Sequence, residues 1–382
     1  MATNFRVLFP ITQQLAYLDN AAVGPISTPV HQAMTKRIDE RRTIGTQPTS
    51  QWDDELSRLR GAFARAAGGS PQRTAILSST SEALGVVAEG FPWKPGDNVV
   101  IPAGEFPANR APWTHLRRRQ VDVRIVPREA DSGRHDAATL LDAVDARTRM
   151  VAVSAVRFDD GWRAPLEELQ GGLTGRDTLL VVDAIQALGA VPIDLEGMKL
   201  DVVCGGGHKW LLGPQGIAGL TLSRRAANCI EPVLVGWNSL RDPWDFDATE
   251  QPLHETSRRF ERSFPPLPEV SGLGAALDLL LAEGLDRLAA EVRDRVQYLL
   301  QGLKVNGFTV RGPDSIAERG SIVTVELARR ADAREVCAAI RQEGVVASVR
   351  RGGLRFAPHA YNNEDDLNRA LGALGRALGS RV

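Results

Sequence analysis

Short apolar runs alternate with segments of helical periodicity between residues 74 and 222. Apolar runs that are short and bounded by turn residues are typical of strands buried on both faces. We expect strands at residues 74–77, 98–101, 121–126, 150–155, 178–182, 202–204 and 217–222. We expect helices between most of them, including residues 81–89, 108–119 and 137–144. Such alternation predicts a largely parallel sheet that is covered by helices on both faces.

The pattern changes after Pro268. A long helical stretch covers residues 269–303 and is interrupted near Gly284. Shorter elements then follow in a different order. We expect strands at residues 308–310, 321–326, 345–349 and 354–356, and helices at residues 332–342 and 363–378. This second pattern predicts a smaller α+β domain at the C-terminal end of the chain.

Composition narrows the class of protein without identifying it. The 382 residues are 43% hydrophobic, which is enough for a large core and more than one domain. The net charge is −1 and no basic stripe is present, so we expect no nucleic acid partner. No apolar run is long enough to span a bilayer and the N-terminus lacks a signal pattern, so we expect a cytoplasmic protein without a membrane partner. The three cysteines are scattered and the six histidines lack metal-ligand spacing, which predicts reduced thiols and no metal site.

Two segments carry the most specific chemistry. Asp183 directly follows the apolar residues 181–182. Further along, the glycine-rich segment 205–207 is followed by His208 and Lys209. Lys209 follows Asp183 by 26 residues, which is enough for a crossover and a return strand. Pyridoxal 5′-phosphate (PLP) enzymes need this pair. The lysine amine forms a Schiff base with the cofactor aldehyde, and the carboxylate keeps the pyridine nitrogen protonated.

A third segment, 78–83, contains several hydroxyl groups between an expected strand and an expected helix. Hydroxyls and free amides at a helix N-terminus bind phosphate through hydrogen bonds and the helix dipole. We expect Thr80 and Ser81 to make these contacts. The alternative is an ordinary helix cap in which Ser79 and Glu82 satisfy the first backbone amides.

Taken together, the ordered motifs of this chain resemble class V members of the aminotransferase superfamily, which are fold-type I PLP enzymes. The most similar groups are cysteine desulfurases and selenocysteine lyases, kynureninases, and isopenicillin N epimerase-like enzymes. The motifs that carry the resemblance are residues 17–22, 105–109, Asp183 with Gln186, 208–210 with 213–214, and 354–356.

The resemblance implies an α/β fold, with a mostly parallel seven-stranded sheet and a smaller C-terminal α+β domain, in a homodimer. Residues 1–30 would form an N-terminal segment that lies over the active site and packs with the small domain. Residues 31–268 would form the large PLP-binding domain, and residues 269–382 the small domain. The active site would lie between the domains and near the subunit interface.

The resemblance also implies roles for individual residues around the cofactor. Lys209 matches the Schiff-base lysine and would be the catalytic base at the substrate Cα. Asp183 matches the partner of the pyridine nitrogen, and Gln186 matches the group beside the phenolic oxygen. Phe106 matches the ring that stacks on the cofactor face, where desulfurases place a histidine. His208 matches a further phosphate contact.

On the substrate side, Arg355 matches the arginine that binds the α-carboxylate. A planar bidentate donor suits that task better than an ammonium group. The neighbouring Arg350 and Arg351 would face solvent or select the substrate side chain. Asn20 and Ala22 match the N-terminal segment over the substrate.

The chain departs from the desulfurase pattern at several positions. Desulfurases carry a nucleophilic cysteine shortly before the carboxylate arginine, whereas residues 347–353 contain none and Cys337 falls in an expected helix. Gly206 replaces a hydroxyl residue. The partner-chain Gly-Thr near the phosphate aligns with Ser263-Phe264, and Arg157 or Phe158 stands where an asparagine is common. Because residues 347–353 contain no cysteine, formation of a persulfide on the protein is disfavoured.

The fold does not determine which reaction follows removal of the Cα proton of the amino acid substrate. We expect β-elimination by a C–S lyase, with transamination or epimerisation as the alternatives. An alternative of another class is a non-catalytic regulator or scaffold that keeps the fold. The sequence shows no helix-turn-helix extension, and it retains Lys209, Asp183 and Arg355, so the enzyme is the favoured interpretation.

Overall fold

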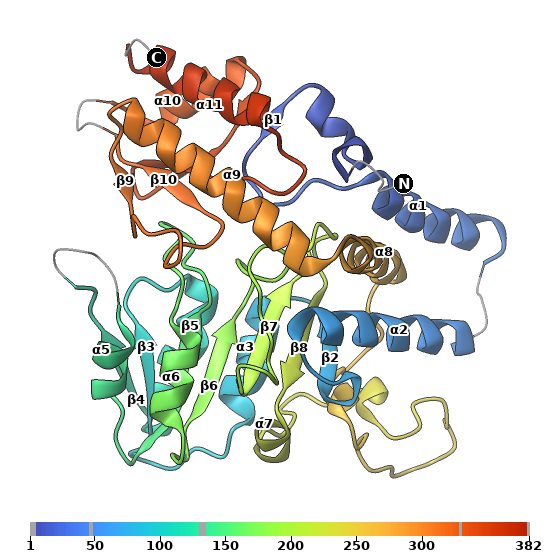
Figure 1. Ribbon diagram of the computed structural model, residues 1–382. Helices are drawn as coiled ribbons and strands as arrows, with labels where there is room; N and C mark the ends of the chain where they lie inside the picture. The colour runs from blue at the N-terminus through green and yellow to red at the C-terminus, as the bar shows by residue number, and fades with distance from the viewer. Residues whose placement is uncertain (1–4, 46–48, 130–134, 328–330, 380–382) are drawn as a thin grey trace.

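A seven-stranded sheet forms the centre of the computed structural model, which describes residues 5–45, 49–129, 135–327 and 331–379. The strand order is β2-β8-β7-β6-β5-β3-β4, and all neighbours are parallel except β8, which is antiparallel to both β2 and β7. The strands are β2 (Thr74–Leu77), β3 (Asn98–Pro102), β4 (Asp122–Val126), β5 (Thr148–Ser154), β6 (Leu179–Asp183), β7 (Val202–Gly206) and β8 (Ala218–Leu222). The predicted α/β fold with a mostly parallel sheet is confirmed (Figure 1).

Helices cover both faces of this sheet because alternate strand residues are apolar on either side. Val151 and Val153 pack toward α2 (Thr49–Ala67), α5 (Ala137–Asp142) and α6 (Leu166–Leu173). Met150 and Ala152 pack toward the opposite set, which consists of α3 (Thr80–Gly90), α4 (Ala111–His115) and α7 (Arg224–Cys229). Burial on both faces explains why these strands show as continuous apolar runs.

The helix expected at 108–119 is only partly correct. The α-helical part is the short α4, and it lies between the 3-10 segments Pro107–Asn109 and Leu116–Arg119. Pro112 occupies the first turn of α4. Proline lacks an N–H and is tolerated at a helix start but not in its interior, so the segment is divided there.

The C-terminal part of the chain builds a second, four-stranded sheet with the order β12-β13-β10-β9. It is preceded by α8 (Leu267–Glu283) and α9 (Leu285–Val305), which meet at Gly284, where φ is 87°. This positive φ suits glycine and ends α8 where the break was predicted. The remaining elements are β9 (Val310–Arg311), β10 (Val323–Val325), α10 (Ala333–Gln342), β12 (Ser348–Arg350), β13 (Gly353–Phe356) and α11 (Glu364–Ala377).

The strand expected at 345–349 is wrong as a single element. Residues 345 and 346 form β11 (Val345–Val346), which pairs in parallel with β1 (Ala16–Tyr17), whereas β12 pairs with β13 in the four-stranded sheet. The chain changes pairing partner at Ala347, and this change depends on contacts with the distant N-terminal segment. The limits of the three predicted domains stay a prediction.

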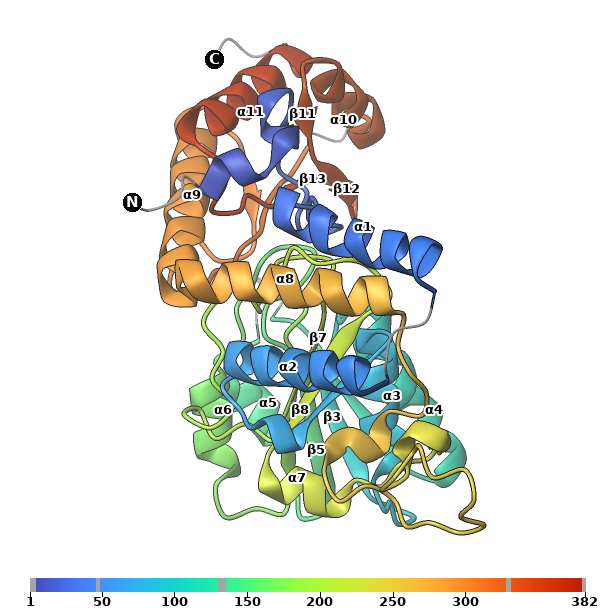
Figure 2. The ribbon, with the colours of Figure 1, turned by 90° about the vertical axis from the view of Figure 1, so that its right-hand side faces the viewer.

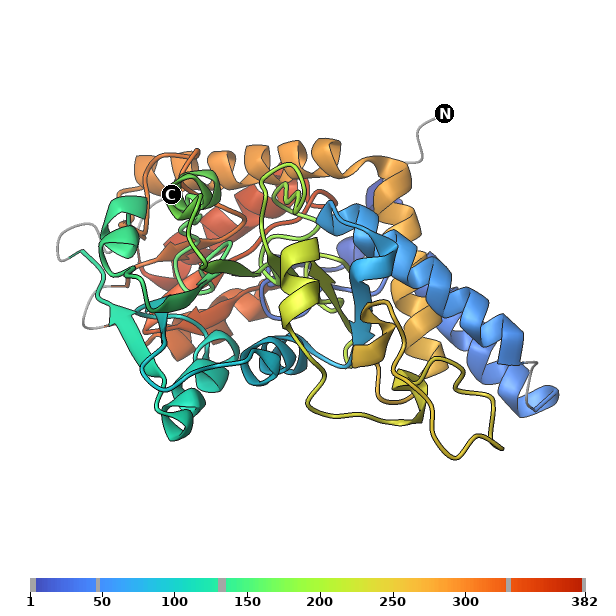
Figure 3. The same cartoon turned by 90° about the horizontal axis from the view of Figure 1, so that it is seen from below.

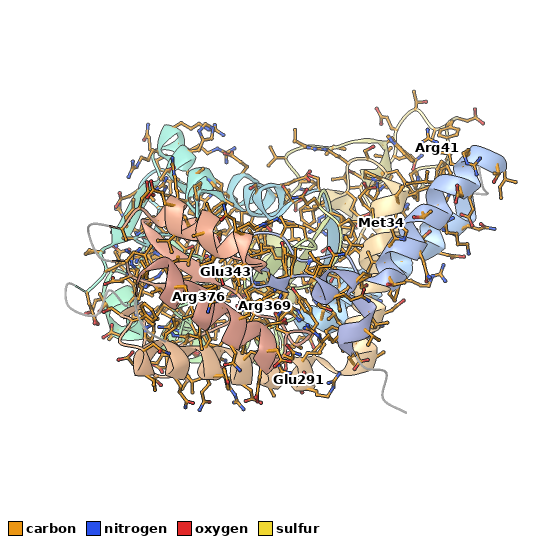
Figure 4. All side chains as sticks on the ribbon, turned by 90° about the horizontal axis from the view of Figure 1, so that it is seen from above. Met34, Arg41, Glu291, Glu343, Arg369 and Arg376 are labelled. Atoms are coloured by element: carbon orange, nitrogen blue, oxygen red, sulfur yellow. The ribbon has the colours of Figure 1, made fainter. Side chains whose placement is uncertain are left out.

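Three helices stack beside the site at which the two sheets face each other. Helix α8 lies between α1 (Thr28–Thr43) and α2 (Figure 2). The absence of a side chain at Gly272 leaves room for Met34 of α1, since a Cβ there would lie 2.8 Å from Met34 Cγ. Figure 4 labels Met34 beside this helix pair. Seen from below, α1, α2 and the segment 231–256 extend toward the same side of the molecule (Figure 3).

Two features of the described residues concern membranes and metal ions. No helix in that part of the chain combines the length and apolar character needed to cross a bilayer. Within the same residues, no three or more His, Cys, Asp or Glu side chains gather in a way that suits a metal ion.

Candidate active site

The carboxyl ends of the parallel strands meet at one edge of the large sheet, where ligands commonly bind in open α/β folds. This edge faces the C-terminal sheet, and the arrows of β6 and β7 point toward it (Figure 1). Ser154 ends β5, Asp183 ends β6 and Gly206 ends β7. Glu105 lies shortly after β3. It is only 5% exposed although its side chain is a carboxylate and lies outside the hydrophobic core. Polar side chains at or just after the ends of three strands, β3, β5 and β6, therefore converge on this edge.

The loop after β7 positions Lys209 at the same edge. The N–H of Gly207 donates to Ile217 O at 2.9 Å, and that of Gly213 donates to Gly207 O at 2.8 Å. The amine Nζ of Lys209 lies 5.7 Å from the centroid of the Phe106 ring. Burial lowers the pKa of Lys209 to about 8, against the charge of Asp183. A larger fraction of neutral amine is therefore present near neutral pH than for an exposed lysine.

Asp183 is buried without a cationic partner close enough for an ion pair. Its side chain is 2% exposed, and Oδ1 accepts a hydrogen bond from the Ile185 N–H at 3.0 Å. Across the described residues, no lysine, arginine or histidine forms a salt bridge with it. Burial raises the pKa of Asp183 to about 6, although the Ile185 N–H and Lys209 act in the opposite direction. A protonated ring nitrogen would satisfy this buried carboxylate.

The hydroxyl of Thr80 is also buried without a partner. Thr80 is the first residue of α3, and its Oγ1 has no hydrogen bond among the described residues. A Cβ on Gly206 would lie 3.4 Å from this oxygen and 3.1 Å from Nδ1 of His208, so Thr80 and His208 lie on the same side of Gly206 and close to it. Burial, and secondarily the charge of Lys209, lowers the pKa of His208 to about 4, which leaves its ring neutral.

The alternative helix cap is present as well. The hydroxyl of Ser79 accepts a hydrogen bond from the Glu82 N–H at 3.1 Å, while the Glu82 carboxylate accepts from the Ser78 N–H at 2.7 Å. The cap uses Ser79 and leaves Thr80 free for a ligand. Ser81 is exposed at the start of α3. Capping and phosphate binding are therefore compatible at this terminus.

Phe106 presents an accessible ring beside the lysine. Its side chain is 44% exposed, and its ring packs edge-on against Phe158 with centroids 5.2 Å apart. A flat ligand can stack on such a surface, but a phenyl ring cannot carry a proton.

Glu105 is a residue of this region for which the sequence suggested no role. Its carboxylate accepts hydrogen bonds from the Ser154 N–H, at 2.8 Å, and from the Ser154 hydroxyl. Burial raises the pKa of Glu105 to about 7, with a smaller contribution from Asp183. The signal that could have identified it is its place just after a strand end and directly before Phe106.

Arg355 lies on β13 and reaches the edge from the small sheet. Its NH2 donates to Asp19 Oδ1 at 3.2 Å, and its NH1 donates to Phe158 O at 2.9 Å. The Nε atom is buried and has no partner in the described part of the chain. Burial lowers the pKa of Arg355 to about 10, and the charge of Arg350 adds to this shift. The sequence did not indicate that Asp19 pairs with this guanidinium, because the two are 336 residues apart.

The N-terminal segment and Gln186 are held in the same region by hydrogen bonds. Gln186 Nε2 donates to Ala21 O at 3.0 Å, and its Oε1 accepts from Trp210 Nε1 at 2.8 Å. Asn20 Nδ2 donates to Ala357 O at 2.8 Å. Ala22 lies in the turn that follows Asn20, where its N–H donates to Asp19 O. The observed partners of Gln186 and Asn20 are protein groups, so their predicted contacts with cofactor and substrate stay predictions.

The donor set fits PLP. An unpaired carboxylate, an amine of lowered pKa, an accessible aromatic ring and an unpartnered hydroxyl at a helix N-terminus lie at one strand edge. These are the groups that a pyridinium nitrogen, an aldehyde, a flat ring and a phosphate require, respectively. The fold and this arrangement define a PLP-dependent enzyme of fold type I.

Comparison with known proteins identifies the family. A model of the aminotransferase class-V family matches residues 16–366, and the chain belongs to this family. The resemblance seen in the motifs, the fold and the dependence on PLP are thereby confirmed, and the non-catalytic alternative is not supported.

Individual relatives are similar over most of the chain. A probable cysteine desulfurase of Methanothermobacter thermautotrophicus is 30% identical over 73% of this chain and 70% of its own length. The uncharacterized aminotransferase YcbU of Bacillus subtilis is 26% identical over 96% of this chain and 95% of its own. The cystine C–S lyase C-DES, solved with its reaction product cysteine persulfide, has a TM-score of 0.88 at 23% identity, covering 96% of this chain and 98% of that one.

Proposed function

We propose that this protein is a PLP-dependent lyase that cleaves the C–S bond of a cysteine-derived amino acid. The observation that supports chemistry at Cα is the position of Lys209, whose amine lies beside the ring of Phe106. Burial lowers the pKa of this amine to about 8. The preference for a C–S bond rests on relatives that are named as cysteine desulfurases and on the fold neighbour named as a cystine C–S lyase.

Each part of the edge has a distinct task in this proposal. PLP supplies an electron sink for the charge that develops at Cα. Asp183 would keep the pyridine nitrogen protonated, and Phe106 would pack on the ring face. Three residues would hold the phosphate: Thr80, Ser81 and His208. Arg355 binds the α-carboxylate and thereby orients the Cα–H bond toward Lys209.

Lys209 Nζ then takes the Cα proton, and the bond from Cβ to sulfur breaks as the thiolate leaves with its electron pair. The thiolate takes up a proton. Addition of one water to the remaining unsaturated fragment yields pyruvate and ammonia. The balanced outcome for a substrate with the side chain CH2–S–R is one thiol, one pyruvate and one ammonium ion.

No cysteine is suited to accept sulfur in this proposal. Cys204 is fully buried beside Asp183, and burial raises the pKa of its thiol well above the ordinary value. Burial also raises the pKa of Cys229 and of Cys337. Cys337 lies in α10, and its Sγ contacts Ala347 O at 3.4 Å. The thiolate form, which is the nucleophile, is disfavoured at all three positions.

A variant in which Cys204, Cys229 and Cys337 are all replaced by alanine should therefore keep most of its turnover. Removal of the buried Cys204 thiol leaves a small cavity, so we expect some loss of thermal stability but not of chemistry. Pyruvate release and bound PLP are measured together. A variant that binds PLP fully but no longer releases pyruvate would instead support a protein persulfide route.

Arg355→Ala should raise KM for amino acid substrates by roughly 10- to 150-fold, because a charge-assisted contact contributes about 1.5–3 kcal/mol. Arg355→Lys should recover little, since an ammonium cannot reproduce the bidentate fork. The absorption band of the resting holoenzyme should stay normal in both variants. Steady-state kinetics with cysteine derivatives provide the measurement.

Arg355 also connects Asp19 with Phe158, so its removal can destabilise the fold as well as weaken substrate binding. Melting temperatures of the variants separate bracing from binding. If Arg355→Ala lowers the melting temperature while KM stays near normal, and the decarboxylated amines react like the amino acids, Arg355 is a brace alone.

An aminotransferase is the second candidate, and its support is the similarity to YcbU. Product analysis over a panel of amino acids and S-substituted cysteines decides between the reactions. Pyruvate with ammonia and thiol supports the lyase, whereas a 2-oxo acid formed only with an amino acceptor supports the transaminase. Racemised substrate without other products would support an epimerase.

We further propose that the protein acts as a homodimer. Exposed apolar side chains occur at Ile38 of α1 and at Ile44 directly after it. Others occur in the segment 231–256, at Val233, Leu234 and Val235. These parts extend toward one side of the molecule (Figure 3). Apolar clusters of this kind commonly become buried in subunit contacts. Light scattering coupled to size-exclusion chromatography tests the proposal, and a monomer at micromolar concentration would contradict it.

A further inference from the structure

Two guanidinium groups lie on the active-site face of the small sheet. Strands β12 and β13 are antiparallel, with Ser348 opposite Arg355 and Arg350 opposite Gly353. Directly opposed residues share a face of the sheet, and so do residues two apart on one strand. Arg350 and Arg355 are therefore diagonal neighbours on one face, at a spacing of roughly 7–8 Å. Gly353 places no side chain opposite Arg350.

Arg351 and Arg355 have carboxylate partners, whereas Arg350 has none among the described residues. Arg355 bonds to Asp19, and Arg351 Nε lies 3.0 Å from Asp159 Oδ2. The hydrogen bond of Arg350 goes from NH1 to the carbonyl of its neighbour Val349, at 2.8 Å. Within the residues that the structure describes, no Asp or Glu forms an ion pair with Arg350, although its side chain is partly buried.

Arg350 is close enough to influence the site electrostatically. Burial is the main cause of the lowered pKa of both Lys209 and Arg355, and the charge of Arg350 adds to each shift. Asp19 offsets the charge of Arg355, whose Nε is still without a partner among the described residues and can bind the α-carboxylate. Arg350 has no anionic partner among the same residues, so its charge is available to a second anionic group of a ligand.

We propose that Arg350 binds a second anionic group, carried by the leaving group of the substrate. This inference rests on the proposed C–S lyase function and specifies its substrate class: a cysteine derivative whose sulfur substituent bears a carboxylate or another anion. Arg355 is the deeper of the two guanidiniums and has a buried Nε without a partner, so it suits the α-carboxylate that every amino acid carries. Arg350 is more accessible and suits a group that varies between substrates.

A pair of compounds that differ only in charge tests this inference. S-carboxymethyl-L-cysteine carries an anionic leaving group, and S-carbamoylmethyl-L-cysteine carries a neutral amide of nearly the same size. Their affinities for the holoenzyme are read from the initial change in its visible absorption band, and thiol and pyruvate release are followed separately. Wild-type enzyme should bind the anionic compound about 10-fold more tightly, the low end for a charge-assisted contact because Arg350 is partly exposed.

Arg350→Gln should weaken binding of the anionic compound about 10-fold and change binding of the neutral compound far less. Arg351→Gln is the matched control, because Arg351 is adjacent in sequence but already paired with Asp159. That control variant should keep the preference of the wild-type enzyme. Raising the salt concentration should reduce the preference of the wild type but have little effect on Arg350→Gln.

The outcomes separate this inference from the function on which it rests. If neither compound releases thiol but the charge preference exists and depends on Arg350, the lyase proposal fails and the assignment of Arg350 stands. Equal binding of the two compounds by wild type, or an unchanged preference in Arg350→Gln, overturns the assignment even when thiol is released. Loss of the preference in Arg351→Gln alone would move the anion site to Arg351 and also overturn it.

Discussion

Lys209→Ala should lower kcat by roughly 10²- to 10⁴-fold or more, because it removes the group proposed to take the Cα proton. It should also abolish the covalent link between PLP and the protein that borohydride reduction makes permanent. PLP itself should still bind, since Asp183, Thr80 and His208 remain in place. The expected result is an enzyme that holds its cofactor and cannot turn over.

Reduction with borohydride followed by peptide mapping measures the attachment site directly. Lys36→Ala is the matched control, because Lys36 lies on the exposed face of α1 with a side chain that is 77% exposed. The control should keep both the covalent link and turnover. Detection of the pyridoxyl group on any lysine other than Lys209 would refute the central assignment of the site.

Asp183→Asn should lower kcat by roughly 10²- to 10³-fold, the loss typical when one electrostatic contact to developing charge is removed. An amide cannot keep the pyridine nitrogen protonated, so the ring withdraws electrons less effectively. Bound PLP should show an altered absorption band, while KM changes less than kcat. A variant with near-normal kcat would show that the carboxylate does not contact the ring nitrogen.

The same substitution should change how the stability of the apoprotein depends on pH. The pKa of Asp183 is about 6 in the folded protein and 3.8 when unperturbed, so the folded state binds more protons between these values. The wild-type apoprotein therefore loses stability as pH rises through this window, by on the order of 3 kcal/mol from this one group. The side chain of the Asp183→Asn variant does not titrate, so the variant does not lose this stability as the pH rises. Melting curves of the two apoproteins from pH 4 to pH 7 should shift progressively in favour of the variant.

Much of the fold was predictable from the sequence for a local reason. Strands β2, β3 and β5 to β8 are buried on both faces, so each shows as an apolar run, and the limits of these strands and of the half-exposed edge strand β4 differ little from the predicted ones. The break between α8 and α9 was predicted at Gly284 because a positive φ favours glycine. Lys209, Asp183 and Arg355 could be singled out because few residue types perform their chemistry and each stands in an unusual apolar or glycine-rich setting.

Other features became visible only with the tertiary structure. The division of residues 345–349 into β11 and β12 depends on pairing with β1, more than 300 residues earlier in the chain. The ion pair between Asp19 and Arg355 and the burial of Glu105 against Ser154 likewise depend on segments that are distant in sequence. The same holds for Arg350, which has no carboxylate partner in the part of the chain that the structure describes.

The amino acid sequence by itself determined the fold class, the cofactor and the residues able to carry the chemistry, because these follow from local periodicity and from side-chain functional groups. The tertiary structure decided which charges are neutralised and which remain available to a ligand. The physical reason is that burial and ion pairing depend on distances between segments that the chain brings together only when it folds. In the small sheet, that difference distinguishes Arg351, which is paired with Asp159, from Arg350, for which the described residues provide no carboxylate partner.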